Sequence, residues 1–412
     1  MGSIGVMFDP TDPAVAADPY PAYAWLRTHA PVYQSAVDGT YLLSRYADVQ
    51  AAWRDRRLGS DYRHRLSDDA LPPGTVAEPW RGGAYPAFAA YTRWDLLAME
   101  PPDHTRLRRL VLEAFTSRAV EAQRATARAV VDEALDAAGP SGRIDVVAAL
   151  AEPLSLRIIC DLIGVPVSDR ARVLTWSHGV VRMYEPAATE ADRAGAEAAV
   201  EAFTAYVGAL IAERRRQPRA DLLSGLLEAM ADGTRLDDAQ ITSTVMLLLM
   251  AGHEASVNAA ANGVAAFAQH PASWELLRSG GASVEAAVEE VLRWDPPLQL
   301  FRRWVLEERV VISGTEIPRG ARVGMLIGAA NRDPARYPDP DRFDVRRGEP
   351  AHQAFGGGIH FCLGAPLARL ELQVLFSLLA ERLPRLAVLP GAVRRPGFQF
   401  RGYSTLPIAV PG

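Results

Sequence analysis

The chain has 412 residues, of which 49% are hydrophobic and 23% charged, and its formal net charge is −5. This composition suits a globular protein with a sizeable core, and the mild acidity gives no reason to expect a nucleic-acid partner, which usually demands a basic surface. All 44 basic residues are arginine. The lack of lysine excludes reactions that need an ε-amine, among them those of Schiff-base aldolases and pyridoxal enzymes.

Cysteine content and hydropathy indicate where the protein works. The two cysteines, Cys160 and Cys362, are too few for a disulfide scaffold or a four-cysteine metal site. The longest strongly apolar run, Val245 to Ala251, is far shorter than the ~20 residues that a membrane helix needs. No charged-then-apolar signal stands at the N-terminus. We therefore expect a soluble, cytoplasmic protein with no membrane partner.

The hydrophobic pattern predicts a mainly α fold with a small β portion, and residues 1–412 are expected to form a single large domain. We expect the β portion to combine residues 31–46, which read as a hairpin, with residues 303–327 and 385–412. Helical periodicity covers 103–138, 146–164, 172–231 with interruptions near Pro186 and Pro218, 237–270, 284–294 and 363–383. Asp237 is a good N-cap for the longest of these helices, and Pro271 ends it.

Residues 58–94 lack clear periodicity and are rich in glycine, proline and aromatic residues. Two interpretations stay open for so long a loop: a lid or partner surface, or an ordered segment packed on the core.

His253-Glu254, in the longest predicted helix, resembles the start of the zinc-protease motif H-E-x-x-H. That motif needs a second histidine four residues after the first, and Val257 occupies the position. A metalloprotease is therefore excluded.

The residues from Phe355 to Gly364 form a glycine-rich loop with Cys362 just before a predicted helix. Glycines allow close approach of the backbone, and a helix N-terminus favours a thiolate, so Cys362 is a good candidate for a soft metal ligand. Cys160 lies on an apolar helical face and is expected to be an inert core residue. The loop matches F-x-x-G-x-H-x-C-x-G, so the chain resembles the cytochrome P-450 family, in the style of its soluble bacterial, actinomycete-like members.

The resemblance implies that Cys362 is the axial ligand of a haem b iron, with Phe355 and Gly356 beside the cofactor. His104 and Arg108 match the family's H-x-x-x-R helix. With Arg303 and His360 they would bind the haem propionates, and Arg302 is a substitute for Arg303 if the register slips by one residue. Planar carboxylates suit arginine donors.

Two further motifs imply a structural ion-pair set. Glu290 and Arg293 match E-x-x-R, and Arg342 matches the arginine of the P-x-R-F meander. The family resemblance implies that these three residues brace the proximal side of the haem.

Residues 251–256 occupy the position of the family's A-G-x-[D/E]-T-[T/S] motif. Gly252 is expected to weaken the helix and leave a groove, and Glu254 to relay protons. Ala255 stands where the family usually has a threonine that helps to deliver protons. A substrate hydroxyl or an ordered water is the expected substitute, and Ser256 is the second choice because it points about 100° away.

The resemblance implies a haem-thiolate monooxygenase that uses O₂ and two external electrons to hydroxylate or epoxidise a medium-to-large apolar natural-product intermediate in secondary metabolism, such as antibiotic biosynthesis. One implied partner is a ferredoxin-type electron donor with its reductase, and Arg106 and Arg109 are the candidate residues for its docking. The other implied partner is a small-molecule substrate, which is free or bound to a carrier protein. The protein is expected to be a monomer. A peroxide-driven peroxygenase or an oxidative coupling enzyme remains an alternative, and a non-catalytic haem sensor a distant one.

Substrate contacts are expected from the aromatic loop, the face of the longest helix and the C-terminal tail. The candidate residues are Trp80, Tyr85, Phe88, Tyr91, Met183, Leu247, Ala251, Leu298, Gln299, Leu300, Phe398 and Phe400.

Overall fold

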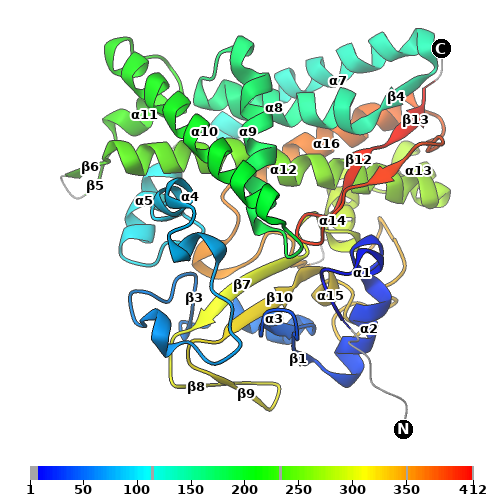
Figure 1. Ribbon diagram of the computed structural model, residues 1–412. Helices are drawn as coiled ribbons and strands as arrows, with labels where there is room; N and C mark the ends of the chain where they lie inside the picture. Colours follow the sequence, from blue (N-terminus) through cyan, green and yellow to red (C-terminus); the bar gives the residue numbers. More distant parts are fainter. Residues whose placement is uncertain (1–7, 113–115, 232–233, 349–350, 411–412) are drawn as a thin grey trace.

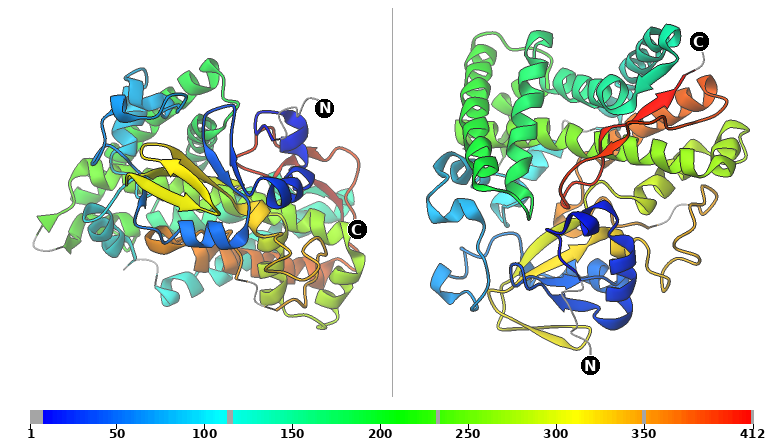
Figure 2. Two further views of the ribbon diagram at one scale, coloured as in Figure 1. Left: turned by 90° about the horizontal axis from the view of Figure 1, so that it is seen from below. Right: turned by 45° about the vertical axis from the view of Figure 1, so that its right-hand side comes forward.

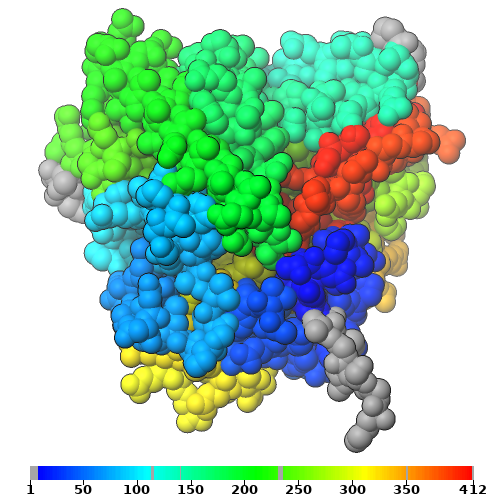
Figure 3. Space-filling model, viewed as in Figure 1, coloured from blue at the N-terminus to red at the C-terminus, as the bar shows by residue number. Residues whose placement is uncertain are grey.

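A computed structural model describes residues 8–112, 116–231, 234–348 and 351–410. Most of the helices form one large part, and a smaller β-rich part lies below it in the view of Figure 1. The two parts share a continuous surface (Figure 3). The predicted mainly α fold with a small β portion is confirmed.

The helices are α1 (Pro13–Ala17), α2 (Tyr20–His29), α3 (Tyr46–Ala52), α4 (Pro86–Thr92), α5 (Asp103–Leu112), α6 (Ser117–Glu121), α7 (Arg124–Ala138), α8 (Glu152–Ile163), α9 (Arg170–Val181), α10 (Glu190–Arg216), α11 (Leu222–Glu228), α12 (Asp238–Gln269), α13 (Pro271–Arg278), α14 (Val284–Trp294), α15 (Ile327–Ala330) and α16 (Ala365–Arg382). The strands are β1 (Val32–Gln34), β2 (Tyr41–Leu43), β3 (Leu58–Gly59), β4 (Arg143–Asp145), β5 (Met230–Ala231), β6 (Thr234–Arg235), β7 (Leu300–Val305), β8 (Arg309–Ile312), β9 (Thr315–Pro318), β10 (Arg322–Leu326), β11 (Val393–Arg394), β12 (Tyr403–Thr405) and β13 (Pro407–Ala409).

Helix α12 runs through the middle of the helical part (Figure 2, right view). Asp237 and Gln240 form a capping box at its start, which satisfies two backbone donors that the helix cannot pair itself. It packs against α8, α9, α10, α14 and α16. The predicted helix over 237–270 is therefore confirmed, and it is the central element of the fold.

The main sheet has the strand order β1-β2-β10-β7-β3. β10 pairs in parallel with β2 and antiparallel with β7, with Val323 opposite both Tyr41 and Arg303. The register therefore joins the hairpin of residues 31–46 to residues 300–326. The C-terminal strands form separate two-stranded sheets, β11 with β12 and β13 with β4.

The helix predicted over 103–138 is interrupted, which corrects the sequence-based interpretation. α5 ends at Leu112, and α6 starts after Thr116, whose hydroxyl accepts a hydrogen bond from the backbone N–H of Ala119. An N-cap of this kind competes with continuation of a preceding helix. Residues 113–115 lie outside the described residues.

Residues 58–94 form an ordered segment, which favours the second of the two interpretations. Its helix α4 packs against α10. The carboxylate of Glu197 on α10 accepts hydrogen bonds from the backbone N–H groups of Ala87 and Phe88 at 2.7 and 2.9 Å, and so caps α4. The Tyr85 hydroxyl donates to Glu190 at 2.6 Å. These contacts tie the aromatic segment to the start of α10.

By length and composition alone, α10 is the one helix among the described residues that could cross a membrane. A core helix of a globular protein passes the same test, and α10 packs against α9, α12 and α4.

Candidate active site

The Cys362 loop is shaped by its glycines and by Trp53 of the segment after α3. Gly356 and Gly358 have φ of 66° and 64°, a conformation that favours glycine. A Cβ on Gly358 would lie 2.1 Å from the carbonyl oxygen of Trp53. The backbone N–H of Cys362 donates to the carbonyl of Phe355 at 2.9 Å, which closes the loop before α16. The close approach expected of these glycines is therefore made to Trp53.

The environment of the Cys362 thiol corrects one expectation. Burial raises the pKa of the thiol above its usual value. The backbone N–H of Gly364 and the Arg108 guanidinium lower this pKa, as expected at the start of a helix, but they do not outweigh burial. The protein alone therefore favours the neutral thiol, and a bound cation is needed to favour the thiolate.

Cys160 is a core residue, as predicted. It is fully buried in α8, and burial raises its pKa to about 12.

Four donor side chains gather beside the Cys362 loop: His104 and Arg108 of α5, Arg303 of β7, and His360. The rings of His104 and His360 lie 4.3 Å apart, and Arg108 Nη2 donates to the Phe361 carbonyl at 2.5 Å. None of the four forms an ion pair with an acidic side chain in the described ranges. The cluster therefore concentrates positive charge and hydrogen-bond donors, and the nearest acidic influence on it is that of Glu100 on Arg303.

The pKa values in this cluster reflect the crowding of cations. Burial, together with the charges of Arg108 and Arg303, lowers the pKa of His104 to about 4. Burial and the neighbouring Arg303, His104 and Arg108 lower the pKa of His360 to about 2. Both ring nitrogens of His104 are buried and lack a hydrogen-bond partner among the described residues. Unpaired buried donors are costly, so the cluster is chemically suited to an anion with several acceptor oxygens.

Arg302 points elsewhere, because neighbouring residues of a strand alternate between its two faces. Its guanidinium lies 4.0 Å from Asp38 and 3.5 Å from the Gln399 side chain. Arg303, not Arg302, therefore belongs to the cluster.

The predicted ion-pair set is correct for two residues and wrong for the third. Arg293 donates to both carboxylate oxygens of Glu290 at 2.7 and 2.8 Å, and both side chains are fully buried. Arg342 turns its carbonyl toward this pair, so its side chain points outward, 62% exposed and 3.7 Å from Asp344. Arg347 takes the expected place, 3.4 Å from Glu290.

On α12, the predicted oxygen-activation segment is recognisable by its exposure. From Ser243 to Phe267, the positions that are not buried are Ala251, Gly252 and Ala255. Ala251 and Ala255 lie one turn apart and so share a face. Three small residues thus form an accessible strip on a helix that is otherwise buried.

The neighbour of Gly252 gives a second reason for glycine at this position. A Cβ at this position would lie 2.6 Å from Cγ1 of Ile159 on α8. Gly252 therefore allows close packing of α12 on α8, and its expected role in an oxygen-binding groove stays a prediction.

Glu254 is 2% exposed and faces away from solvent toward three basic groups. Arg395 Nη1 donates to its Oε2 at 2.9 Å, and its Oε1 lies 3.3 Å from His178 Nε2 and 3.7 Å from His253 Nε2. Burial raises the pKa of Glu254, but the charges of His253, Arg395 and His178 more than offset this and hold the pKa below its usual value. The carboxylate is therefore favoured.

Sequence reasoning missed Glu371 of α16. This carboxyl is buried, accepts a hydrogen bond from Ser155 Oγ at 2.7 Å and interacts with the Ser256 hydroxyl. Burial raises its pKa to about 7. Ser256 is thus turned toward α16 and the Glu371 carboxyl. The glutamate stands nine residues after Cys362, but an apolar helix gives no signal that one of its acids faces the core.

Several predicted substrate residues form one aromatic cluster. Phe88 lies 4.9 Å from Trp80, 5.7 Å from Tyr91 and 5.6 Å from Tyr184, between ring centroids. Met183, Leu247 and the buried members of the aromatic cluster belong to the main hydrophobic core. The aromatic segment and the turn after α9 therefore form one apolar wall.

The predicted contacts near the C-terminal tail separate into two groups. Leu298 and Phe400 pair across an isolated β-bridge, and Phe400 packs on the main core. Gln299 is buried, where its side chain binds a tyrosine hydroxyl and a backbone carbonyl. Leu300 and Phe398 belong to the core cluster of the N-terminal helices. Extended backbone alternates sides, so Gln299, Leu300 and Phe398 are corrected to core residues.

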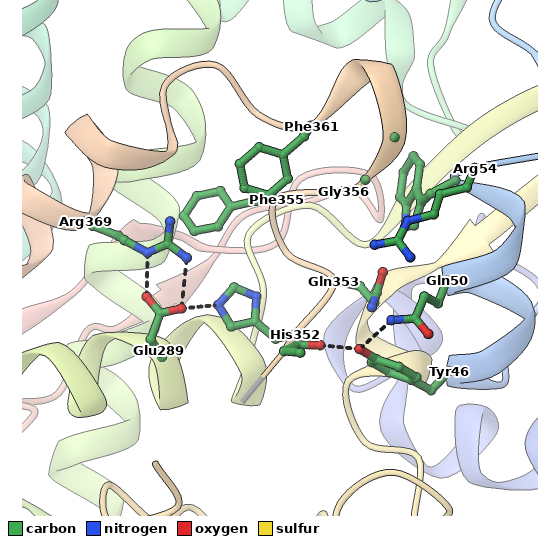
Figure 4. A pocket seen from close by; sticks show the side chains of 14 residues that line it. Tyr46, Gln50, Arg54, Glu289, His352, Gln353, Phe355, Gly356, Phe361 and Arg369 are labelled. Atoms are coloured by element: carbon green, nitrogen blue, oxygen red, sulfur yellow. Dashed lines mark hydrogen bonds and ion pairs between the residues drawn. The ribbon is translucent and has the colours of Figure 1, made fainter. Parts of the chain in front are cut away.

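A pocket of 510 Å³ lies beside the Cys362 loop (Figure 4). Phe355, Gly356 and Phe361 line it together with α3, and Glu289 bridges Arg369 and His352 at one end. It contains none of the predicted substrate residues, so it is a feature of the cysteine-loop side of the site.

Comparisons with known proteins identify the family. The family model for Cytochrome P450 matches residues 81–279 and 283–386. Cytochrome P450 monooxygenase PikC of Streptomyces venezuelae is 39% identical over 95% of this chain and 91% of its own length. 6-deoxyerythronolide B hydroxylase of Saccharopolyspora erythraea is 36% identical over 96% of each chain. The solved structure of P450BioI with a hexadec-9Z-enoic acid-ligated acyl carrier protein has a TM-score of 0.89 at 31% identity, covering 96% of this chain and 100% of that one.

The chain therefore belongs to the cytochrome P450 family, and it is a haem-thiolate monooxygenase. The predicted family and enzyme class are confirmed. The residues present fit the haem that the family uses, because two unpaired nitrogens of His104 and an unneutralised group of arginines stand beside a cysteine at the start of a helix.

Substitution of Glu290 by glutamine tests the corrected ion-pair set. Glu290→Gln removes the counter-charge of a fully buried arginine and should lower the free energy of unfolding by about 3–5 kcal/mol. Arg342→Gln should change it by less than about 0.5 kcal/mol, because that side chain is exposed. Urea unfolding of the two haem-loaded variants measures both. Equal losses would show that Arg342 belongs to the set.

The buried Glu371 predicts a pH dependence of stability. Its pKa rises from the usual value of about 4.3 when unfolded to about 7 in the folded protein, so the folded state binds more protons between these values. The contribution of Glu371 to the free energy of unfolding is fully present below about pH 4 and is lost as the pH rises to about 7. As the pH rises over this range, the free energy of unfolding of Glu371→Gln should increase by up to about 3 kcal/mol relative to that of the parent protein. Urea midpoints at several pH values measure it, and a constant difference would contradict the prediction.

Proposed function

We propose that this monooxygenase hydroxylates or epoxidises a medium-to-large apolar natural-product intermediate, as a tailoring step of secondary metabolism. The observation that carries the proposal is the unneutralised donor cluster of His104, Arg108, Arg303 and His360 beside Cys362. This arrangement suits a planar dianionic cofactor whose metal takes a thiolate. Haem b would supply the activation of oxygen and its transfer to the substrate.

In this proposal each residue of the cluster has a defined task. Cys362 ligates the iron, and the arginines and histidines hold the two propionates, whose negative charge relieves the crowding of cations. Phe355 and Gly356 lie next to the cofactor. Charge-assisted hydrogen bonds from these side chains, with the unpaired His104 among them, would give both affinity and orientation.

The substrate class follows from the apolar character of the proposed binding wall. Trp80 and Tyr184, which are only partly buried and pack on Phe88, offer aromatic surface, and the accessible strip of α12 offers methyl groups. Such a wall binds hydrophobic molecules and places few polar constraints on them. The names of PikC and 6-deoxyerythronolide B hydroxylase support a macrocyclic or polyketide intermediate. The P450BioI complex supports a carrier-bound substrate as the second form of delivery.

The electrons would come from a ferredoxin-type donor with its reductase, acting on a monomeric, cytoplasmic enzyme that is free of a membrane. Ile359 and Phe361 are 49% and 43% exposed, and both flank Cys362. Arg109 is exposed on α5, and Arg106 contacts Asp103 at 3.8 Å. Exposed apolar residues near basic ones suit a transient acidic partner.

Residue 255 is alanine, so proton delivery cannot use a side-chain hydroxyl at this position. Ser256 is turned toward Glu371, so it is a poor substitute for the usual threonine. Glu254 is the acid on α12 closest to the accessible strip, and Arg395 orients it. We therefore assign the missing donor to a hydroxyl of the substrate, with an ordered water as the other option.

Ligation by Cys362 is tested by the carbon monoxide difference spectrum of the reduced protein. The parent protein should show a strongly red-shifted Soret band, and Cys362→Ala should lose it entirely, because a thiolate ligand causes the shift. Cys160→Ala is the matched control and should keep the band. An unshifted band in folded parent protein would contradict the proposed function.

Substrate assistance is tested by adding the missing hydroxyl. With a substrate analogue that lacks its hydroxyl, Ala255→Thr should raise the fraction of reductant coupled to product by about tenfold, since a positioned proton donor contributes about 10²–10⁴-fold. Ala251→Thr, one turn earlier on the same strip, should leave coupling low. Unchanged coupling in Ala255→Thr for hydroxyl-bearing and hydroxyl-free substrates would favour the ordered water. Efficient peroxide-driven turnover without redox partners would favour a peroxygenase instead.

A further inference from the structure

Three potential metal ligands meet between α9 and α12. They are His178 Nε2, His253 Nε2 and Glu254 Oε1, and all three atoms lie within 4.8 Å of one another. The distance from Glu254 Oε1 is 3.3 Å to His178 and 3.7 Å to His253. Two helices distant in sequence thus direct two imidazoles and one carboxylate at the same point.

The hydrogen bonding of His253 leaves one ring nitrogen available. Its Nδ1 lies 2.9 Å from the carbonyl oxygen of Leu249, so Nδ1 carries the proton and donates it. The Nε2 atom then has a free lone pair, and it has no hydrogen-bond partner among the described residues although the side chain is fully buried. Metal-binding histidines typically donate their other N–H to a backbone carbonyl in this way.

The Glu254 carboxylate also has one oxygen fixed by a hydrogen bond and the other available for a ligand. Glu254 Oε2 accepts a hydrogen bond from Arg395 at 2.9 Å, which orients the group. Its Oε1 is buried and has no hydrogen-bond partner in the described part of the chain. Ligating carboxylates in proteins are usually fixed by a hydrogen bond to the second oxygen.

We propose that His178, His253 and Glu254 bind one divalent transition-metal ion of the Zn²⁺ class. In tetrahedral coordination with bonds of about 2.1 Å, the ligand atoms stand about 3.4 Å apart. The two distances from Glu254 already approach this value, so small side-chain rotations close the site. The site differs from the H-E-x-x-H zinc motif, in which the glutamate is a general base and not a ligand.

Charge and access both suit a cation. Glu152 Oε1 lies 4.0 Å from His178 Nε2, so two carboxylates face a single guanidinium, that of Arg395. The His178 side chain is 38% exposed, which gives an ion a route from solvent to the buried ligands. Two imidazoles and one carboxylate favour zinc over magnesium, which prefers oxygen ligands alone. The site is separate from the proposed haem ligands, but it shares Glu254 with the proposed proton delivery.

The test is zinc binding by the haem-loaded enzyme. After dialysis against a chelator, the protein is titrated with ZnCl₂ and followed by calorimetry, and elemental analysis gives the zinc-to-iron ratio. We expect one zinc per haem iron with micromolar or tighter affinity, and a rise in the thermal midpoint. MgCl₂ at the same concentrations should give neither.

Variants connect the binding to these ligands. His178→Gln and His253→Gln should each weaken zinc binding by at least about tenfold, because each removes one of three ligands. His64→Gln, an exposed histidine elsewhere, should bind as the parent protein does. His178 is partly exposed, so its variant is expected to fold, and circular dichroism checks this. The absence of zinc binding in the parent protein, or unchanged affinity in folded His178→Gln, would overturn the proposal.

Discussion

The burial of α12 on nearly all sides is the constraint on which the rest of the structure depends. Because water does not reach a helix in this position, its polar side chains depend on the helix backbone or on other elements for hydrogen-bond partners. The C-terminal tail provides many of these partners. Asn262 Nδ2 donates to the carbonyls of Asp295 and Arg401 at 3.0 Å, and Arg394 donates to Asn262 Oδ1 at 3.1 Å.

The same tail also connects α12 to the N-terminal helices. Arg401 donates to the carbonyls of Ala16 and Ala17 at 2.9 Å and pairs with the buried Asp295 at 2.7 Å. Figure 3 shows the C-terminal tail in red beside the N-terminal segment in blue. The ends of the chain are thus joined across the central helix. Arg395 reaches Glu254 from this tail, so the state of the buried carboxylate is coupled to the packing of residues about 140 positions away.

The parts of the fold and site that could be predicted from the sequence are those whose residues are close together along the chain. Glu290 and Arg293 lie one turn apart on a single helix, so their pairing needs no knowledge of the tertiary structure. The length of α12 and the position of Cys362 before α16 were predictable for the same reason. The prediction for Arg342 was wrong because the meander sets the direction of its side chain, and Arg347 contacts Glu290 in its place. Spacing along the chain carries no information on that choice.

Other parts of the site depended on packing that a sequence does not show. Gly252 is explained by Ile159 of another helix, and Glu371 looks from the sequence like any other acid on a helix. Likewise, the resemblance implied the propionate-binding residues His104 and Arg303, but the lack of an ion-pairing acidic side chain became visible only once the described elements were assembled.

The central helix divides acidic groups between two environments, and this division limits proton transfer. Glu371 is buried with neutral hydroxyl partners, so its pKa is raised toward neutrality, whereas Glu254 is buried with basic partners, so its pKa is lowered. A carboxylate held by Arg395 and two imidazoles gives up a proton readily but takes one up reluctantly. Because Ala255 has no hydroxyl, the proposed proton delivery depends on a hydroxyl that the substrate or an ordered water supplies.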